Sequence, residues 1–126
     1  MSTTSPRKPR VLVVDDEAAI RGALSRGLRG AYDVVLAADG QEAIELLERD
    51  PAINAVVTDL DMPNLGGIEL HRWLMRHLPG LAGRTIVMTG GRGAHMEWLA
   101  TFGGEVIDKP ASLDAIRASL ERVMAS

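Results

Sequence analysis

Five short runs of apolar, mostly β-branched residues recur along the chain, and a segment with helical spacing follows each of them. The runs cover residues 11–14, 34–36, 55–58, 85–88 and, more weakly, 106–107. Continuous apolar runs of this length are typical of strands that are buried on both faces of a parallel sheet. The alternation therefore predicts an α/β domain in which five strand–helix units follow one another, (βα)5.

The segments between the runs place apolar residues three or four positions apart, as an amphipathic helix does. In residues 17–29, for example, Ile20, Leu24 and Leu28 fall on one stripe. Further helices are predicted over residues 41–49, 67–78 and 94–102, and a last one follows Ser112 as its N-cap. Pairs such as Asp39-Gly40 and Pro79-Gly80 signal turns. Right-handed crossovers then give a three-layer sandwich around a parallel sheet.

Polar residues stand directly after four of the predicted strands. Asp15 and Asp16 follow the first strand, Asp59 the third, Thr89 the fourth, and Lys109 comes two positions after the fifth. Because the carboxyl ends of parallel strands meet at one edge, where such sheets have their working sites, these side chains are expected to lie close together.

Carboxylates crowded at one edge repel each other unless a cation compensates them. A site that is rich in oxygen and lacks His and Cys favours a hard ion, so we expect Mg²⁺ (or Mn²⁺). Asp16 and Asp59 are interpreted as direct ligands, with Asp15 close by or acting through water. The competing interpretation is that Asp15, Asp16 and Glu17 merely cap the first helix, where negative charge is favourable.

The same residues suit phosphoryl chemistry. A carboxylate such as that of Asp59 is able to attack phosphorus and form an acyl phosphate. Lys109 and the metal would neutralise the phosphoryl oxygens, and the Thr89 hydroxyl would donate a hydrogen bond to one of them.

Composition excludes several other classes of protein. The chain has no cysteine, which excludes disulfides and thiolate sites, and its net charge of −3 favours neither nucleic acid nor an anionic membrane as a direct partner. Residues 1–9 are polar and basic without an apolar run, so we interpret them as a lead-in or linker stub rather than a signal peptide. We expect a cytoplasmic domain over residues 10–126.

Five stretches, taken together, resemble the receiver domain of bacterial two-component response regulators. They are residues 11–17 (VLVVDDE), 38–43 (ADGQEA), 57–63 (VTDLDMP) with Gly66-Gly67, 87–90 (VMTG) and 108–110 (DKP). The resemblance implies a flavodoxin-like fold with strand order 2-1-3-4-5. It also implies a histidine kinase or phosphotransfer domain as phosphodonor, and an output partner that binds the face of helix 4, strand 5 and helix 5. Residues 88–91 (MTGG), together with the lack of an aromatic residue at position 106, are similar to receiver domains of hybrid histidine kinases.

The resemblance also implies a role for each site residue. Asp59 would be the phosphoacceptor, Asp15 and Asp16 the acidic pair, Thr89 the switch hydroxyl and Lys109 the partner of the phosphoryl group. The backbone carbonyl of Asp61 would complete the metal shell, and the Lys109–Pro110 peptide would be cis.

Three features depart from the family or stand outside its pattern. Val106 occupies the place of the usual aromatic switch residue, and valine has no large ring that could swing between exposed and buried states. The Asp61 side chain either steers water toward the acyl phosphate or points into solvent, and we favour solvent. His71, His77 and His95 are predicted to be solvated. Trp98 is predicted to be partly buried by neighbouring side chains, and a partner-binding patch is the alternative.

Two other functions remain open. The pair Asp59 and Asp61 has the spacing found in Asp-based phosphohydrolases, although those enzymes carry it on the first strand. A receiver domain that binds partners without phosphorylation is the third reading. We favour the phosphoacceptor, whose chemistry would be limited to self-phosphorylation and autodephosphorylation and would not make it an enzyme.

Overall fold

The computed structural model describes residues 8–125, so the predicted lead-in lies almost wholly outside the described residues. The strands are β1 (Arg10–Val14), β2 (Asp33–Ala37), β3 (Ile53–Asp59), β4 (Thr85–Thr89) and β5 (Glu105–Asp108). All pair in parallel in the order β2-β1-β3-β4-β5, which confirms the predicted topology. The helices are α1 (Ala18–Leu28), α2 (Gly40–Arg49), α3 (Gly67–His77), α4 (Pro79–Ala82), the 3-10 turn η1 (Arg92–His95), α5 (Met96–Phe102) and α6 (Leu113–Ala125).

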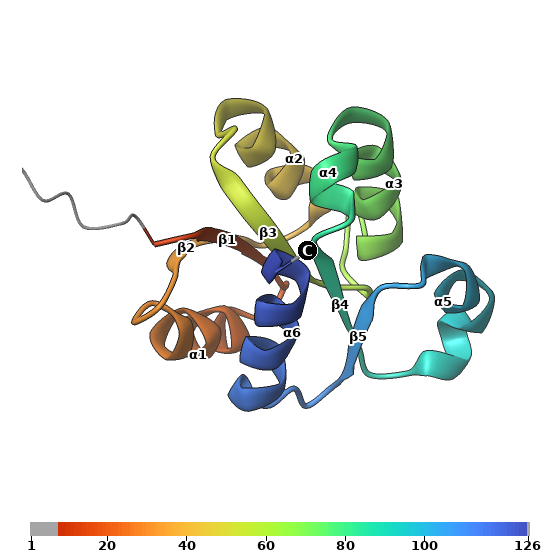
Figure 1. Ribbon diagram of the computed structural model, residues 1–126. Helices are drawn as coiled ribbons and strands as arrows, with labels where there is room; N and C mark the ends of the chain where they lie inside the picture. The colour runs from red at the N-terminus through yellow and green to blue at the C-terminus, as the bar shows by residue number, and fades with distance from the viewer. Residues whose placement is uncertain (1–7, 126) are drawn as a thin grey trace, which may run out of the picture.

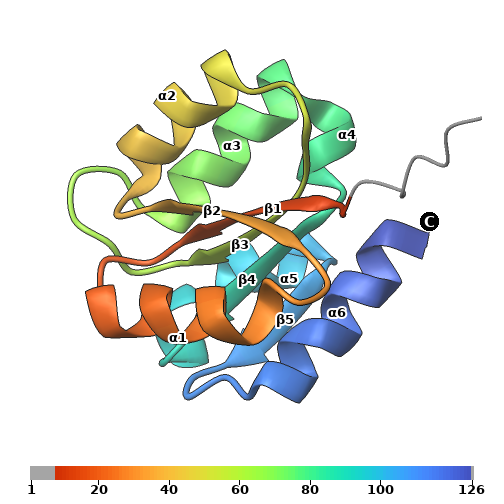
Figure 2. The ribbon, with the colours of Figure 1, turned by 90° about the vertical axis from the view of Figure 1, so that its left-hand side faces the viewer.

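Helices cover both faces of the sheet, as Figures 1 and 2 show, with α1 and α6 on one face and α2, α3 and α4 on the other. Each face has its own apolar core. Leu24 and Leu28 of α1 pack with Ile116 and Leu120 of α6 in one cluster. The second cluster joins α2 and α3 to the opposite sides of β1 and β3. Burial of all three central strands on both faces explains why their sequences are continuously apolar.

Polar caps fix where two helices begin. The carboxylate of Asp39 accepts a hydrogen bond from the Glu42 N–H at 2.8 Å, and the Glu42 side chain accepts one from the Ala38 N–H at 3.1 Å. This reciprocal pair satisfies N–H groups that have no partner within α2. Ser112 accepts from the Ala115 N–H at 3.0 Å, which confirms it as the N-cap of α6.

Two sequence predictions need correction. The helix predicted over residues 94–102 is a 3-10 turn, η1, followed by seven residues of α-helix. The Pro79-Gly80 turn is wrong, because Pro79 begins the short helix α4, a position where its missing N–H costs nothing. Leu81 and Ala82 of α4 are buried in the second core cluster, so tertiary packing overrides the local turn signal.

Strand register sets the positions of the site residues. Val14 of β1 lies beside Thr58 of β3, so the residue after each of them, Asp15 and Asp59, meets the other at the same edge. Thr89 at the end of β4 pairs with Asp108 at the end of β5, directly before Lys109. Residues far apart in the sequence thus reach one rim because the strands end level with one another.

Candidate functional site: the acidic rim

Three carboxylates meet at the rim. Ligand oxygens of Asp15, Asp16 and Asp59 all lie within 4.8 Å of one another. Asp15 is fully buried and Asp59 is 4% exposed, whereas Asp16 faces solvent. Three oxygen ligands from carboxylates, one of them open to water, fit a hard divalent ion that keeps some of its water ligands, as Mg²⁺ does. The donor set therefore fits the metal that the sequence implies.

Lys109 joins two of these carboxylates. Its Nζ donates to Asp15 Oδ2 and to Asp59 Oδ2, at 3.1 Å in each case. Burial opposes the charged form of Lys109, but these hydrogen bonds and the two nearby negative charges outweigh it and raise the pKa of the ammonium group. Lys109 therefore stays charged. Its ammonium group lies beside Asp59 Oδ2, where it would be close to the negative oxygens of an incoming phosphoryl group.

Asp59 has both oxygens engaged. Oδ2 accepts from Lys109, and Oδ1 accepts from the backbone N–H of Asp61 at 3.2 Å. Burial raises the pKa of the Asp59 carboxyl, against the lowering effect of Lys109 and the Asp61 N–H, while the charge of Asp15 raises it further. A buried carboxylate of this kind gains from a cation, since the cation restores part of the stabilisation that water would give.

The remaining oxygens of Asp15 are also used. Asp15 Oδ1 accepts from the Glu17 N–H at 2.9 Å, and the Asp15 carbonyl accepts from Arg21 at 2.7 Å. Asp15 thus orders the turn between β1 and α1 as well as holding Lys109. The competing interpretation, that these acidic residues cap α1, is not supported, because the N-cap residue Glu17 accepts no hydrogen bond from the helix through its side chain.

Close backbone packing of α3 against the end of β3 holds Asp59 in place. The first residue of α3, Gly67, lies against the carbonyl oxygen of Asp59 and the Cα of Leu60, so a Cβ at Gly67 would overlap both. The Gly67 N–H donates to the Leu60 carbonyl at 3.1 Å. Gly67 is therefore required for a close approach of two backbone segments, in addition to marking a turn.

Three further features predicted from the sequence lie near the rim, at Thr89, Val106 and the Lys109–Pro110 peptide. Thr89 is buried, and its Oγ1 accepts from the Gly91 N–H at 3.1 Å. Val106 is half-buried in β5, and a valine there offers no ring that could swing between two positions. The Lys109–Pro110 peptide is cis, the isomer that the resemblance implies.

Asp61 and His95 form a contact that the sequence did not reveal. His95 Nε2 lies 2.8 Å from Asp61 Oδ1, with 17% of the His95 side chain and 61% of the Asp61 side chain exposed. The prediction of a solvated His95 is therefore wrong, and the Asp61 carboxylate, although largely in solvent, has a partner. The two residues are 34 positions apart in unrelated segments, so neither spacing nor composition could have paired them.

The prediction of a solvated His71 is also wrong. His71 is buried on α3, where its ring meets those of Trp98 and Phe102 edge to face at centroid distances of 5.6 and 5.0 Å. Burial lowers the pKa of His71, against a hydrogen bond to the backbone of Ala82. Trp98 stacks on Phe102 at 4.8 Å, so these three rings join α5 to α3.

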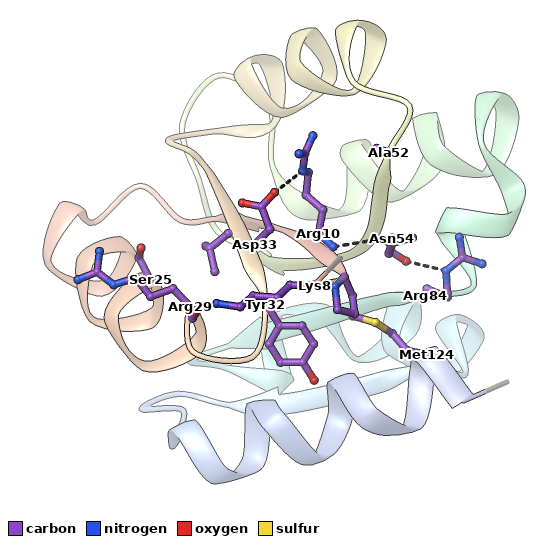
Figure 3. A pocket seen from close by; sticks show the side chains of 12 residues that line it. Lys8, Arg10, Ser25, Arg29, Tyr32, Asp33, Ala52, Asn54, Arg84 and Met124 are labelled. Atoms are coloured by element: carbon purple, nitrogen blue, oxygen red, sulfur yellow. Dashed lines mark hydrogen bonds and ion pairs between the residues drawn. The ribbon is translucent and has the colours of Figure 1, made fainter. Parts of the chain in front are cut away.

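A hollow at the opposite edge of the sheet is shown in Figure 3. Its volume is about 1310 Å³, and Arg10, Arg84 and Lys8 are among its lining residues. Neighbouring groups already bind these cations, because Arg10 pairs with Asp33 at 2.7 Å and Arg84 donates to the Asn54 carbonyl at 2.6 Å. The convergent carboxylates and Lys109 are at the other edge, so the acidic rim is the candidate site.

The rim and the flavodoxin-like order of strands define the class of domain, and comparison with known proteins gives the family. Residues 11–121 match the response regulator receiver domain family. The chain belongs to this family.

Individual relatives agree with the assignment. The response regulator MprA of Mycolicibacterium vanbaalenii is 33% identical over 116 residues, which are 91% of this chain and 50% of that protein. A response regulator receiver protein from Pseudomonas putida is 28% identical with a TM-score of 0.80, covering 94% of this chain and 99% of that one. A receiver domain protein from Clostridium thermocellum has a TM-score of 0.83 at 23% identity, covering 93% and 94%, and supports the fold.

The chain spans about half the length of the curated relatives it matches. Among residues 8–125, no helix combines the length and the apolar character that crossing a membrane requires.

Proposed function

We propose that this receiver domain accepts a phosphoryl group on Asp59, in a reaction that depends on Mg²⁺ or Mn²⁺. The observation that carries the proposal is the environment of the Asp59 carboxylate, which is buried against Lys109 and within reach of the oxygens of Asp15 and Asp16. Phosphoryl transfer depends mainly on positioning and on neutralisation of charge, and these residues supply both.

The transfer would proceed by displacement at phosphorus. An Asp59 oxygen forms a bond to phosphorus as the P–N bond of a phosphohistidine breaks, and the imidazole nitrogen keeps the electron pair. Lys109 Nζ, which donates to Asp59 Oδ2 before the transfer, would then donate to an oxygen of the phosphoryl group. Asp16 and Asp59, with the Asp61 carbonyl, would hold the divalent ion, which supplies the remaining positive charge when bound.

The donor and the output follow from the family. A histidine kinase or phosphotransfer domain would supply the phosphoryl group in the cytoplasm, and a conformational change would then regulate an output domain or protein. The output face would be formed by α5, β5 and α6. These are the helix 4, strand 5 and helix 5 of the family pattern, because the short helix α4 shifts the numbering by one. On this proposal the domain is a switch and turns over only its own acyl phosphate.

Incubation with Mg²⁺ and a small acyl phosphate, followed by intact-mass measurement, tests the acceptor. We expect a gain of one phosphoryl group in the parent protein and none in Asp59→Asn. Asp114→Asn is the matched control, because Asp114 lies on the exposed surface of α6 and should leave the uptake unchanged.

Two results would contradict the proposal. Uptake by Asp59→Asn would place the acceptor elsewhere, and absence of uptake by the parent protein would favour a domain that binds partners without phosphorylation. Hydrolysis of a general phosphate ester over many turnovers would favour the phosphohydrolase reading that the spacing of Asp59 and Asp61 leaves open.

A further inference from the structure

The short helix α5 is attached to the domain differently from the longer helices α1, α2, α3 and α6. None of its residues is buried, and none of its side chains belongs to either core cluster. Figure 1 shows it at the β5 end of the sheet, away from α1 and α2. The rings of Trp98 and Phe102 pack against His71 of α3, and a hydrogen bond joins Asp61 to His95, the residue directly before α5.

The segment that leads into α5 has little packing of its own. A Cβ at Gly90, Gly91 or Gly93 would meet nothing within 4 Å, so the backbone there borders open space. Besides the His95–Asp61 contact, the segment has an ion pair between Arg92 and Asp108 at 2.7 Å, in which both side chains are at least half exposed. An exposed pair of this kind adds little stability. His95 is better shielded, so its contact with Asp61 is the stronger restraint.

A short path of hydrogen bonds connects the phosphoacceptor with this restraint. Asp59 Oδ1 accepts from the Asp61 N–H, and the Asp61 carboxylate in turn pairs with His95 Nε2. An acyl phosphate has lost the carboxylate charge, so whichever oxygen carries the phosphorus, Oδ1 becomes a weaker acceptor for the Asp61 N–H. Modification of Asp59 thereby weakens the hydrogen bond that positions Asp61, the residue that pairs with His95.

We propose that the Asp61–His95 contact is a latch that keeps α5 docked in the unphosphorylated domain and is released when Asp59 is modified. The inference rests on the proposed function and names its conformational switch. Val106 provides no rotating ring at the usual position, and the latch supplies another connection between the acceptor and α5. Release exposes the rings of Trp98 and Phe102, the apolar part of α5 that is half-buried at rest.

Trp98 reports directly on the docking of α5. The chain has two tryptophans, so Trp73→Phe leaves Trp98 as the only one. Accessibility of Trp98 to iodide is then measured by fluorescence quenching at one fixed pH, with Mg²⁺ alone and with Mg²⁺ and beryllofluoride. Intact-mass or fluorine NMR measurement on the same samples shows whether the acceptor is occupied.

In this background we expect beryllofluoride to increase quenching of Trp98. His95→Ala should raise quenching without beryllofluoride, by a shift of roughly two- to tenfold in the ratio of undocked to docked α5, the usual effect of losing one hydrogen bond. Because coupling between two equilibria is reciprocal, beryllofluoride should bind His95→Ala more tightly by up to the same factor. His95→Gln, which retains a donor, should restore the resting signal.

Arg92→Ala is the matched control, since it removes the other ion pair of the same segment without touching Asp61. It should leave Trp98 quenching close to that of the parent. If His95→Ala has the same resting signal as the parent, or binds beryllofluoride more weakly, the latch is refuted. A parent that takes up no beryllofluoride would refute the proposed function, whereas occupied Asp59 with an unmoved Trp98 would refute the latch alone.

Discussion

The helices α5 and α6 follow neighbouring strands but are held in opposite ways. α6 buries Ile116, Leu120 and Val123 in the core that it shares with α1. α5 has no fully buried residue, and its contacts with the rest of the domain include ring contacts with His71 and one hydrogen bond near its start. Apolar burial is broad and non-directional, whereas a single hydrogen bond depends on the positions of two atoms.

The difference separates a framework from an element that is able to move. Elements with few buried apolar contacts open at low free energy, while those in the core open only when the whole domain unfolds. The ends of β1, β3 and β5 therefore fix the acidic rim, and α5 is free to respond to it. A switch needs a rigid site and a movable helix. If the acidic rim moved together with α5, it could not hold a metal ion and a phosphoryl group in a defined geometry.

The largest expected effect tests this contrast directly. Leu120→Ala on α6 removes a fully buried side chain and should lower the free energy of unfolding by about 2–5 kcal/mol. Leu99→Ala on α5 removes a half-buried one and should cost less than about 1 kcal/mol. Urea unfolding followed by circular dichroism measures both. Equal losses would show that α5 is as firmly packed as α6.

The second effect concerns the rim as a cation site of the folded state. Mg²⁺ should stabilise the parent by about 1.4 kcal/mol at ten times its Kd, because it binds only when Asp15, Asp16 and Asp59 are brought together. Asp16→Asn removes an exposed ligand and should abolish most of the shift in Tm without damaging the core. Thermal unfolding with and without Mg²⁺ is the measurement. An equal shift in parent and variant would exclude Asp16 as a ligand.

Sequence alone predicted the framework well because it is built from repeated, local signals. Continuous apolar runs mark the strands, and their carboxyl ends place Asp15, Asp59 and Lys109 at one rim. The environment of α5 was not predictable in the same way. His71 lies on a helix with charged neighbours, and its burial comes from Trp98 and Phe102, which are remote in the sequence.

The Asp61–His95 contact escaped prediction for the same reason. The contact depends on the backbone path of the segment before His95, which contains Gly90, Gly91 and Gly93. Glycine adopts many backbone conformations, so local propensity does not predict this path. The helix α4 shows the opposite case, in which a clear local signal at Pro79 was overridden by burial of Leu81. Local patterns therefore predict elements and strand ends, while contacts between loops and rings require the tertiary structure.

The smallest expected effect is the pH dependence of the contact between α3 and α5. Because burial lowers the pKa of His71, the unfolded chain binds a proton more readily than the folded one. His71 therefore contributes stability above its unfolded pKa of about 6.5, and the contribution is lost as pH falls from there through the lower pKa of the folded state. His71→Gln keeps a donor for the Ala82 backbone but does not titrate, so its stability should fall less on acidification.

Urea midpoints at pH values on either side of this window, compared between variants, measure the difference. His77→Gln is the control, because His77 is an exposed residue of the same helix and its replacement should leave the pH dependence of the parent intact. The effect should be smaller than that of Mg²⁺, since the rings lie at the margin of the core. If His71→Gln loses as much stability on acidification as the parent, the ring contact does not exclude water. The docking of α5 would then rest on the Asp61–His95 contact.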